Sequence, residues 1–503
     1  MTINFDFSDN VITQIIEEIN TAKEYIRIAI FQLHNVEVFE ALQRKLDEGV
    51  KVEIFTLPFD SLKAKVRAET EKNFQKIAEK GAEIRFNQWG EGNPDNTRTA
   101  VEGWYCFHGK FIVTDQSAIA LSANFTNKQE LDAILIYRND QLKIKEFNDK
   151  LDFLKNLFIN PKDRFDGEIR ELITKAVNGD TDKIFALPKR VNAIHEGHWI
   201  RKYPNSLIVP VTTLEEKLYL TPFDGKGREI FRRAIAEAEQ FIFLSTESFT
   251  DMEFANSLIE LLTRKAIDVK IVTGTESRDF KERVNELFKG LLTQTIGLRT
   301  TEGNSHAKLM ITDKALIVSS VNLNKMNLGF EEGKNFWSEN TESIYLSRDP
   351  SLVKEAKTKF LSVFDSSLNV SEVLKEKIAK EVSDLYETTF NLRVESQTKL
   401  LFAGLLLKQQ IYAKRFVIRI GKIAKKLVSF SGKSVVEKND LLCALVLFYL
   451  SELGKQTVES LQERLSEMDK KINVASLLTT LINCGLVERE DNYFKLRVEA
   501  ALE

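Results

Sequence analysis

Apolar residues recur at helical spacing and then at strand spacing in two separate parts of the chain. The segment 11–33, VITQIIEEINTAKEYIRIAIFQL, predicts a helix followed by an apolar strand at 26–33. The segment 227–249, GREIFRRAIAEAEQFIFLSTESF, repeats that order, with a strand at 241–245. The shared order indicates two related halves.

The correspondence continues along both halves. VFEALQRKLDEGVKVEIFTL predicts a helix and a strand at 50–57, and FANSLIELLTRKAIDVKIVTG predicts a helix and a strand at 268–273. A third helix and short strand follow in each half, in NFQKIAEKGAEIRFN and RVNELFKGLLTQTIGLRTT. Helices alternating with short apolar strands predict an α/β fold in which a mixed sheet is covered by helices on both faces. We place the halves at 1–155 and 216–365, joined by an insert at 156–215 that is rich in charges and turns.

Beyond residue 365 the pattern becomes helical. The segment 396–436 contains no acidic residue but nine basic ones, and we call its region, 366–436, the basic helical region. The nine are Lys399, Lys408, Lys414, Arg415, Arg419, Lys422, Lys425, Lys426 and Lys433. Residues 437–503 then predict three helices and a hairpin, which is the order of a winged helix-turn-helix.

Composition limits the classes of protein to consider. With 503 residues, 43% of them hydrophobic, the chain has ample core for two to four domains. Its net charge is −3, so the chain as a whole is not a polycation, and any surface that binds nucleic acid must be a basic patch confined to one part of it. Three cysteines without a Cys-x-x-Cys pair predict neither a disulfide framework nor a zinc site, and fit a reducing cytosol. With no signal peptide and no long uncharged apolar run, we expect a cytoplasmic protein without a membrane span.

One 17-residue pattern occurs once in each half. FHGKFIVTDQSAIALSAN at 107–124 and SHAKLMITDKALIVSSVN at 305–322 share His-x-Lys, four residues, Asp, six residues and Ser-x-Asn. Because residues two apart share one face of a strand, a hairpin would gather the polar side chains of each motif. These are His108, Lys110, Ser122 and Asn124 in the first half, and His306, Lys308, Ser320 and Asn322 in the second. Asp115 and Asp313 are interpreted as structural turn residues.

Such a cluster suits phosphodiester transfer. An imidazole can attack phosphorus or protonate a leaving oxygen, while lysine and asparagine donate hydrogen bonds to the non-bridging oxygens. Asp132 and Glu342 occupy matching places after the two motifs. They are either carboxylates that hold each imidazole in one tautomer or ordinary surface acids.

These residues resemble the phospholipase D superfamily, the HKD phosphodiesterases, over residues 10–365. The resemblance implies two-step phosphoryl transfer through a phosphohistidine, with no metal and no cofactor. It also implies His108 as the nucleophile and His306 as the general acid and base. The glycine common before the motif serine is replaced by Leu121 and Ser319, which bears on how the substrate fits. A second hypothesis is a catalytically idle member of the family.

The rest of the chain favours one substrate class. A nucleic-acid backbone attracts clustered lysine and arginine, so we assign nucleic-acid binding to part of the basic helical region. The residues so assigned are Lys408, Lys414, Arg415, Arg419, Lys422, Lys425 and Lys426. The hypothesis is a nuclease that cleaves DNA in preference to RNA, with defence against foreign DNA as an analogy.

Two alternatives remain open. One is a phospholipase or phosphatidyltransferase acting on lipids, and the other is an idle DNA-binding protein. The third helix of the last domain carries polar residues such as Ser476 and Thr479 but little positive charge. The C-terminal region is therefore also a candidate for binding a partner protein or a second copy of the chain.

Overall fold

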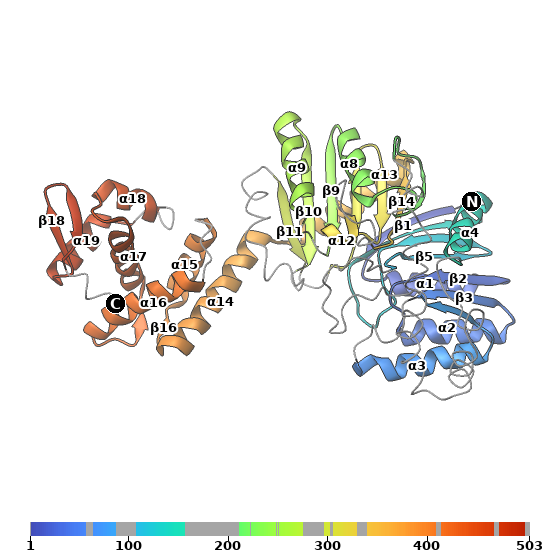
Figure 1. Ribbon diagram of the computed structural model, residues 1–503, viewed down its shortest axis with the longest axis horizontal. Coiled ribbons are helices and arrows are strands. Elements are labelled where there is room, and N and C mark those ends of the chain that lie inside the picture. Colours follow the sequence, from blue (N-terminus) through green and yellow to red (C-terminus); the bar gives the residue numbers. More distant parts are fainter. Residues whose placement is uncertain are drawn as a thin grey trace, which may run out of the picture. The chain divides into compact units, whose positions relative to one another are not determined.

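The structure is a computed structural model. It describes residues 2–56, 64–86, 107–155, 211–221, 223–247, 249, 251–274, 296–301, 305–328, 340–408, 414–466 and 472–497. The chain divides into two compact units, Met1–Ser367 and Leu368–Glu503 (Figure 1). Most of the insert predicted at 156–215 lies outside the described residues, as does the third helix predicted in the second half. No helix in the described ranges is long and apolar enough to cross a membrane.

The first half of unit 1 is a seven-stranded mixed sheet in the order β1-β7-β6-β5-β2-β3-β4. Its strands are β1 (Thr2–Ser8), β2 (Tyr25–Ala29), β3 (Lys51–Thr56), β4 (Glu83–Phe86), β5 (Phe111–Thr114), β6 (Ser117–Leu121) and β7 (Asp132–Arg138). Strands β2, β3 and β4 are parallel, and β5, β6 and β7 are antiparallel to their neighbours. The outer face is covered by α1 (Val11–Thr21), α2 (Val36–Asp47) and α3 (Ala64–Glu79), whose apolar sides share a core with the sheet.

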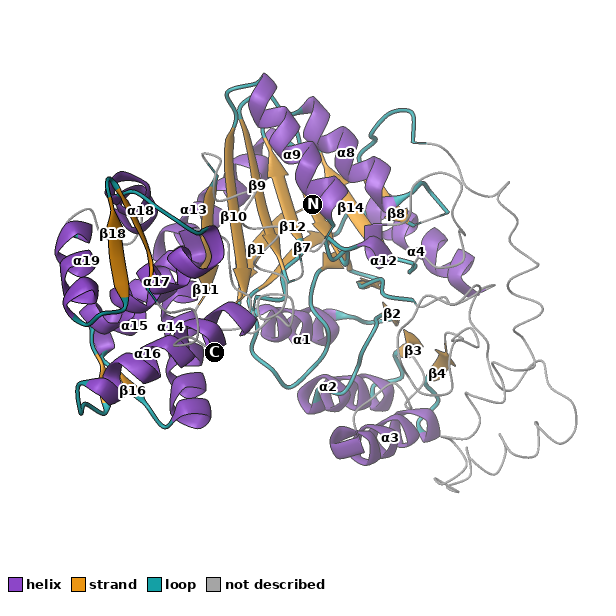
Figure 2. Cartoon of the chain, turned by 60° about the vertical axis from the view of Figure 1, so that its left-hand side comes forward, coloured by secondary structure: helices purple, strands orange, loops and turns teal. Residues whose placement is uncertain are grey.

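The second half repeats this order. Seven strands of unit 1 lie in the order β8-β14-β13-β12-β9-β10-β11, so that β8 stands where β1 stands in the first sheet. The strands are β8 (Lys217–Leu220), β9 (Phe241–Thr246), β10 (Asp268–Gly274), β11 (Gly297–Thr301), β12 (Leu309–Thr312), β13 (Leu316–Ser319) and β14 (Ser343–Ser347). The helices are α8 (Gly227–Glu237), α9 (Met252–Arg264) and the short α12 (Lys325–Leu328), with α8 beside α9 (Figure 2). The predicted α/β class, with two related mixed sheets flanked by helices, is confirmed.

One hydrophobic core joins the two halves. It contains inward-facing residues of both sheets together with α4 (Gln141–Lys155) and α13 (Pro350–Ser366). The Phe360 ring, on α13, stacks on Phe7 of the first sheet at 6.1 Å and on Phe243 of the second at 5.1 Å between centroids. Fully burying a phenylalanine side chain contributes about 1.5–3 kcal/mol, so this core fixes one sheet against the other.

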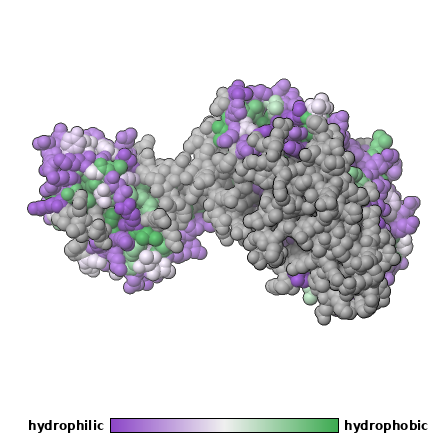
Figure 3. All heavy atoms as spheres, viewed as in Figure 1, coloured by the Kyte–Doolittle hydropathy of each residue, from purple (hydrophilic) through white to green (hydrophobic). Residues whose placement is uncertain are grey.

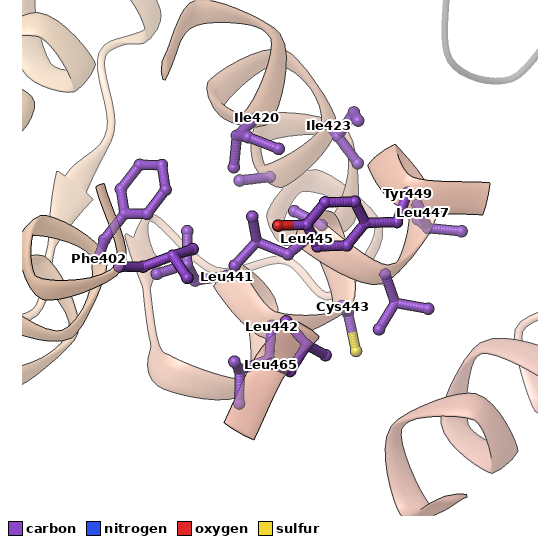
Figure 4. Close-up of a cluster of buried hydrophobic side chains, with 14 of the residues drawn as sticks. Phe402, Ile420, Ile423, Leu441, Leu442, Cys443, Leu445, Leu447, Tyr449 and Leu465 are labelled. Carbon is purple, nitrogen blue, oxygen red and sulfur yellow. The ribbon is translucent and has the colours of Figure 1, made fainter. Parts of the chain in front are cut away.

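Unit 2 is mainly helical, around its own core. Its helices are α14 (Val370–Phe390), α15 (Ser396–Lys408), α16 (Lys414–Phe430), α17 (Lys438–Leu453), α18 (Val458–Ser466) and α19 (Val474–Asn483). Its short strands are β15 (Leu368–Asn369), β16 (Arg393–Val394), β17 (Val435–Val436), β18 (Val487–Glu490) and β19 (Tyr493–Leu496). Phe402, Ile420, Leu445 and Leu465 meet in this core (Figure 4). Helices α17, α18 and α19 are followed by the antiparallel pair β18–β19, and Gln456 bridges to Phe494 of that pair.

Candidate active site

The two His-x-Lys pairs lie immediately before strands rather than in them. Strand β5 begins at Phe111 and β12 at Leu309, so the prediction that His108 and Lys110 share a strand face was wrong. The backbone N–H of His108 donates instead to the carbonyl oxygen of Thr341 at 2.7 Å. In the same way, the N–H of His306 donates to the carbonyl oxygen of Leu131 at 3.0 Å.

These bonds attach the motif of each half to the segment that precedes the last strand of the other half. Parallel bridges between Phe107 and Thr341 and between Leu131 and Ser305 extend both attachments. The backbone at each motif histidine therefore pairs with the other half, while the strands that follow it remain in their own sheet. This pairing also brings the motif of one half beside the polar residues of the other.

His108 is buried with its two ring nitrogens in different surroundings. Its Nδ1 lies 2.8 Å from Oε2 of Glu342, and Nζ of Lys110 lies 3.3 Å from its Nε2 and 3.4 Å from its Nδ1. The Phe31 ring packs against the imidazole in an edge arrangement, 4.5 Å between centroids. Burial, only partly offset by Glu342, lowers the pKa of His108 to about 4. The ring is therefore neutral near pH 7, with its Nδ1 proton held by Glu342 and a lone pair left on Nε2.

His306 lies between two carboxylates from different halves. Its Nδ1 is 3.0 Å from Oδ1 of Asp132, and its Nε2 is 3.5 Å from Oε2 of Glu247. The amide nitrogen Nδ2 of Asn124 is 3.3 Å from the same Nε2. Asp132 and Glu342 thus contact the imidazoles of the opposite halves, and their ring contacts are of the kind that fixes a tautomer.

The motif serines support those two carboxylates. The hydroxyl of Ser122 donates to Oδ1 of Asp132 at 2.7 Å, and the hydroxyl of Ser320 donates to Glu342. The side chain of Asn327, at α12, also donates to Glu342. Asn327 was not expected from the sequence, because nothing in the repeated motif points to it. Each serine therefore holds a carboxylate in place.

The two motif asparagines retain unused hydrogen-bonding capacity. Oδ1 of Asn124 and Oδ1 of Asn322 are buried and have no hydrogen-bond partner among the described residues. A buried polar atom without a partner is costly and calls for a specific explanation, such as a catalytic role or a bound water or ion. Each amide thus keeps its Oδ1 acceptor for a water or a leaving hydroxyl, whereas a phosphate oxygen can only meet its Nδ2 donor.

The motif lysines are buried cations that share one electrostatic site. Nζ of Lys110 donates to the carbonyl oxygen of His108 at 2.8 Å, and Nζ of Lys308 donates to the carbonyl oxygen of His306 at 2.5 Å. Burial and then the charge of Lys308 lower the pKa of Lys110 to about 7. The charge of Lys308 also lowers the pKa of His108, after burial and its nearer neighbours. The two motifs therefore share one cluster, in which Nδ2 of Asn124 from the first motif lies 3.3 Å from Nε2 of His306 from the second.

Glu247 is a site residue that sequence reasoning missed. It follows β9, and its Oε2 lies 3.2 Å from Nζ of Lys308. Burial opposes its ionisation, but the charges of Lys308 and His306 outweigh burial and lower the pKa of Glu247 to about 2. Glu247 is consequently a carboxylate at any working pH. An alignment of β2 with β9 would have revealed it, because the equivalent position after β2 carries no charge.

The motif aspartates lie away from this cluster. Oδ1 of Asp115 accepts from the backbone N–H groups of Lys23 and Glu24, at 2.9 and 3.2 Å. Oδ1 of Asp313 accepts from those of Glu239 and Gln240, at 2.9 and 3.0 Å. Burial raises the pKa of each aspartate, but hydrogen bonds, which for Asp115 include one from the Gln116 side chain, outweigh it and lower the pKa. Both aspartates tie a hairpin turn to the segment that leads into the second strand of the same half, β2 or β9.

One group of side chains offers metal-ligand chemistry. Within the described part of the chain, ligand atoms of Glu130, Asp132 and His306 lie within 4.8 Å of one another. Oδ1 of Asp132 already accepts from Ser122 and contacts Nδ1 of His306. This oxygen of Asp132 is therefore already shared between a serine hydroxyl and the imidazole.

The basic residues expected to bind nucleic acid belong to unit 2. Arg419, Lys422 and Lys425 are exposed at successive three-residue intervals on α16, and Lys426 is half-buried. Arg419 pairs with Glu452 and covers the Phe448 ring at 5.3 Å. The side chains of Lys408, Lys414 and Arg415 lie outside the described ones. We define the α16 face as Arg419, Lys422 and Lys425. It therefore carries two exposed lysines and one arginine that is already paired with an acid.

Comparisons with known proteins identify the family. The family model "Cardiolipin synthase, PLD-like domain" matches residues 15–151 and 231–364, more than half of the chain. The structure is similar to phosphatidylserine synthase from Haemophilus influenzae Rd KW20, with a TM-score of 0.50 and 14% identity over 73% of this chain and 87% of that one. Polyphosphate kinase from Porphyromonas gingivalis gives a TM-score of 0.40 and 12% identity, over 71% of this chain and 46% of that one. Among curated proteins, no sequence matches this chain.

A phospholipase D family member, NUC, from Salmonella typhimurium gives a TM-score of 0.25 and 18% identity, covering 32% of this chain and 97% of that one. The family match spans both halves and includes both His-x-Lys motifs. The chain therefore belongs to the phospholipase D superfamily of phosphodiesterases and phosphatidyltransferases.

Proposed function

We propose that the protein is a nuclease that cleaves DNA, and RNA less readily, without a metal ion and through a phosphohistidine. The observation that supports this substrate class is the α16 face. It is exposed and basic, and it lies in a 41-residue stretch, 396–436, that contains no acidic side chain. Clustered cations of this kind gain affinity for a polyphosphate backbone by releasing its counterions.

The first chemical step transfers the phosphoryl group to His108. Its Nε2 lone pair attacks phosphorus, an N–P bond forms, and the P–O bond to the leaving group breaks. The leaving oxygen takes a proton from Nε2 of His306 and departs as an alcohol. Lys110 and Lys308 hold the charge that develops on the non-bridging oxygens.

The second step returns the enzyme to its starting state. Nε2 of His306 now accepts a proton from water, whose oxygen attacks phosphorus as the N–P bond breaks. The products are a phosphomonoester and the free imidazole of His108. Glu342 and Asp132 hold the Nδ1 protons of the two rings throughout both steps.

Unit 2 supplies the binding surface in this proposal. Its last elements, α17, α18, α19, β18 and β19, have the order of a winged helix. The exposed residues of α19 include Ser476, Thr479 and Thr480 and carry no charge, which supports contact with a partner protein or a second copy of the chain there. Figure 3 shows hydrophilic and apolar residues intermingled on one face of this unit. We place the protein in the cytoplasm and, by analogy, in defence against foreign DNA.

A lipid substrate is the second candidate. Its support is the name of the matching family model, together with the shared fold of a phosphatidylserine synthase. In that case the same two steps would release or exchange a lipid headgroup. The two candidates differ only in which diester enters the site.

One assay separates the candidates. Wild-type protein and the variants His108→Ala and His306→Ala are incubated in EDTA with plasmid, single-stranded DNA, RNA and phospholipid vesicles. His34→Ala, a change at a histidine just ahead of α2, serves as the matched control. Cleavage of DNA that both active-site variants lose and the control keeps supports the proposal. Headgroup release without DNA cleavage refutes it in favour of the lipid candidate.

A further inference from the structure

The two halves of the site differ at one pair of equivalent positions. Ala29 of β2 pairs with Phe111, three residues after His108, and Ser245 of β9 pairs with Leu309, three residues after His306. Ala29 and Ser245 are therefore equivalent. Counting two residues on makes Phe31 the counterpart of Glu247.

These counterparts meet equivalent partners but bring opposite chemistry. Phe31 packs on the His108 ring and lies under Nζ of Lys110, 5.4 Å from the ring centroid. Glu247 places Oε2 3.5 Å from Nε2 of His306 and 3.2 Å from Nζ of Lys308. The first half presents an uncharged aromatic edge where the second presents a carboxylate.

The position of Glu247 is one that a substrate oxygen also needs. In the proposed reaction, a non-bridging oxygen of the phosphate contacts the Lys308 ammonium, and the leaving oxygen contacts Nε2 of His306. A carboxylate oxygen already contacts both nitrogens. With 41% of its side chain exposed, Glu247 stands at the solvent side of the cluster rather than inside the core. Any bound phosphate therefore lies beside a fixed negative charge.

We propose that Glu247 determines the charge selectivity of the site, favouring monoanionic phosphodiesters and excluding dianionic phosphomonoesters. Coulomb repulsion is proportional to the charge of the ligand, so a dianion is penalised twice as much in free energy as a monoanion. The substrate is a monoanion. Hydrolysis adds a water oxygen to phosphorus and releases an alcohol, so the product is a monoester with a second pKa of about 6 and two negative charges at pH 7.5. Glu247 therefore permits binding of the diester substrate and promotes dissociation of the monoester product.

The inference rests on the proposed phosphodiesterase activity of this site, but not on DNA as the substrate. It is tested with bis(p-nitrophenyl) phosphate as the substrate, and with phenyl phosphate and diphenyl phosphate as competing dianion and monoanion at pH 7.5. The variant Glu247→Gln keeps the size of the side chain and removes its charge. The matched control is Glu239→Gln, which removes an exposed carboxylate paired with Lys314 at 2.8 Å in the same half.

Glu247→Gln should bind both inhibitors more tightly than the wild type does, and the gain should be larger for the dianion than for the monoanion. In Glu247→Gln the inhibition constant of phenyl phosphate falls by about tenfold and that of diphenyl phosphate by about threefold, the square root of the larger factor. Glu239→Gln leaves both constants within about twofold, since exposed charges are screened. Unchanged constants, equal changes for both inhibitors, or a loss of kcat with unchanged constants would each overturn the proposal.

A second measurement needs no turnover. The rise in Tm on adding phenyl phosphate reports binding directly, and it should be larger for Glu247→Gln than for the wild type. An equal or smaller rise contradicts the inference. A protein that hydrolyses the aryl diester but ignores DNA refutes the nuclease and leaves this test intact.

Discussion

Oδ1 of Asp132 in the first half lies 3.0 Å from Nδ1 of His306 in the second. The reverse contact joins Glu342 of the second half to Nδ1 of His108 at 2.8 Å. Each half therefore orients the imidazole of the other. Because each catalytic ring comes from one half and its carboxylate from the other, neither half contains a complete site.

This crossing predicts different defects for the two carboxylates. Asp132→Asn should slow cleavage about 10- to 100-fold for diesters with poor leaving groups and less for p-nitrophenyl esters, because it acts through the general acid His306. Glu342→Gln should slow both substrate types alike, because it acts through the nucleophile His108. The measurement is kcat across a leaving-group series. Asp149→Asn, at an exposed acid paired with Lys145, is the control; identical profiles for the two site variants would contradict the crossed assignment.

The two histidine variants should fail at different steps. With bis(p-nitrophenyl) phosphate the leaving group needs no proton, so His306→Ala should release p-nitrophenol in a single burst. It should then stall as a phosphohistidine, with steady-state kcat lower by at least about 10²-fold. His108→Ala should give no burst. Stopped-flow absorbance and acid-labile phosphate on the protein check this, and a burst in His108→Ala with none in His306→Ala would reverse the roles.

The pH profile of kcat/KM should follow the shifted groups of the first motif. His108, with its pKa lowered to about 4, keeps the Nε2 lone pair down to that pH, so activity should persist well below the ordinary histidine pKa of 6.5. Lys110, with its pKa lowered to about 7, loses its charge as the pH rises past 7 and should weaken phosphate binding there. Kinetics from pH 4 to 9 test this. Lys110→Arg, which stays charged, should lessen the alkaline fall even if it lowers the maximum.

The α16 face should contribute to the salt dependence of DNA binding. Replacing Lys422 and Lys425 with glutamate should weaken binding and reduce the slope of log K against log salt by about two, since each phosphate contact contributes about 0.9. Fluorescence anisotropy over a salt series measures the slope. Lys145→Glu, at an exposed lysine of α4, is the control. An unchanged slope would mean that the α16 face does not contact DNA and is an ordinary solvated helix surface.

The sequence predicts much of the site but not how it is assembled. The repeat identifies the histidines, lysines, serines and asparagines, because chemistry constrains their types and spacing. It places His108 and Lys110 in a strand, since periodicity within one half carries no information about the bond to Thr341 of the other half. Which carboxylate meets which ring depends on how the two sheets pack, and that packing depends on residues such as Phe360, far from the motifs.

The difference between Phe31 and Glu247 bears on why the two halves share one chain. A site assembled from two identical subunits must present the same residue at both equivalent positions, because one gene encodes both. Covalent linkage removes that obligation. The two halves can therefore carry different residues at equivalent positions, as they do with Phe31 and Glu247, so the two ends of one site can differ in charge.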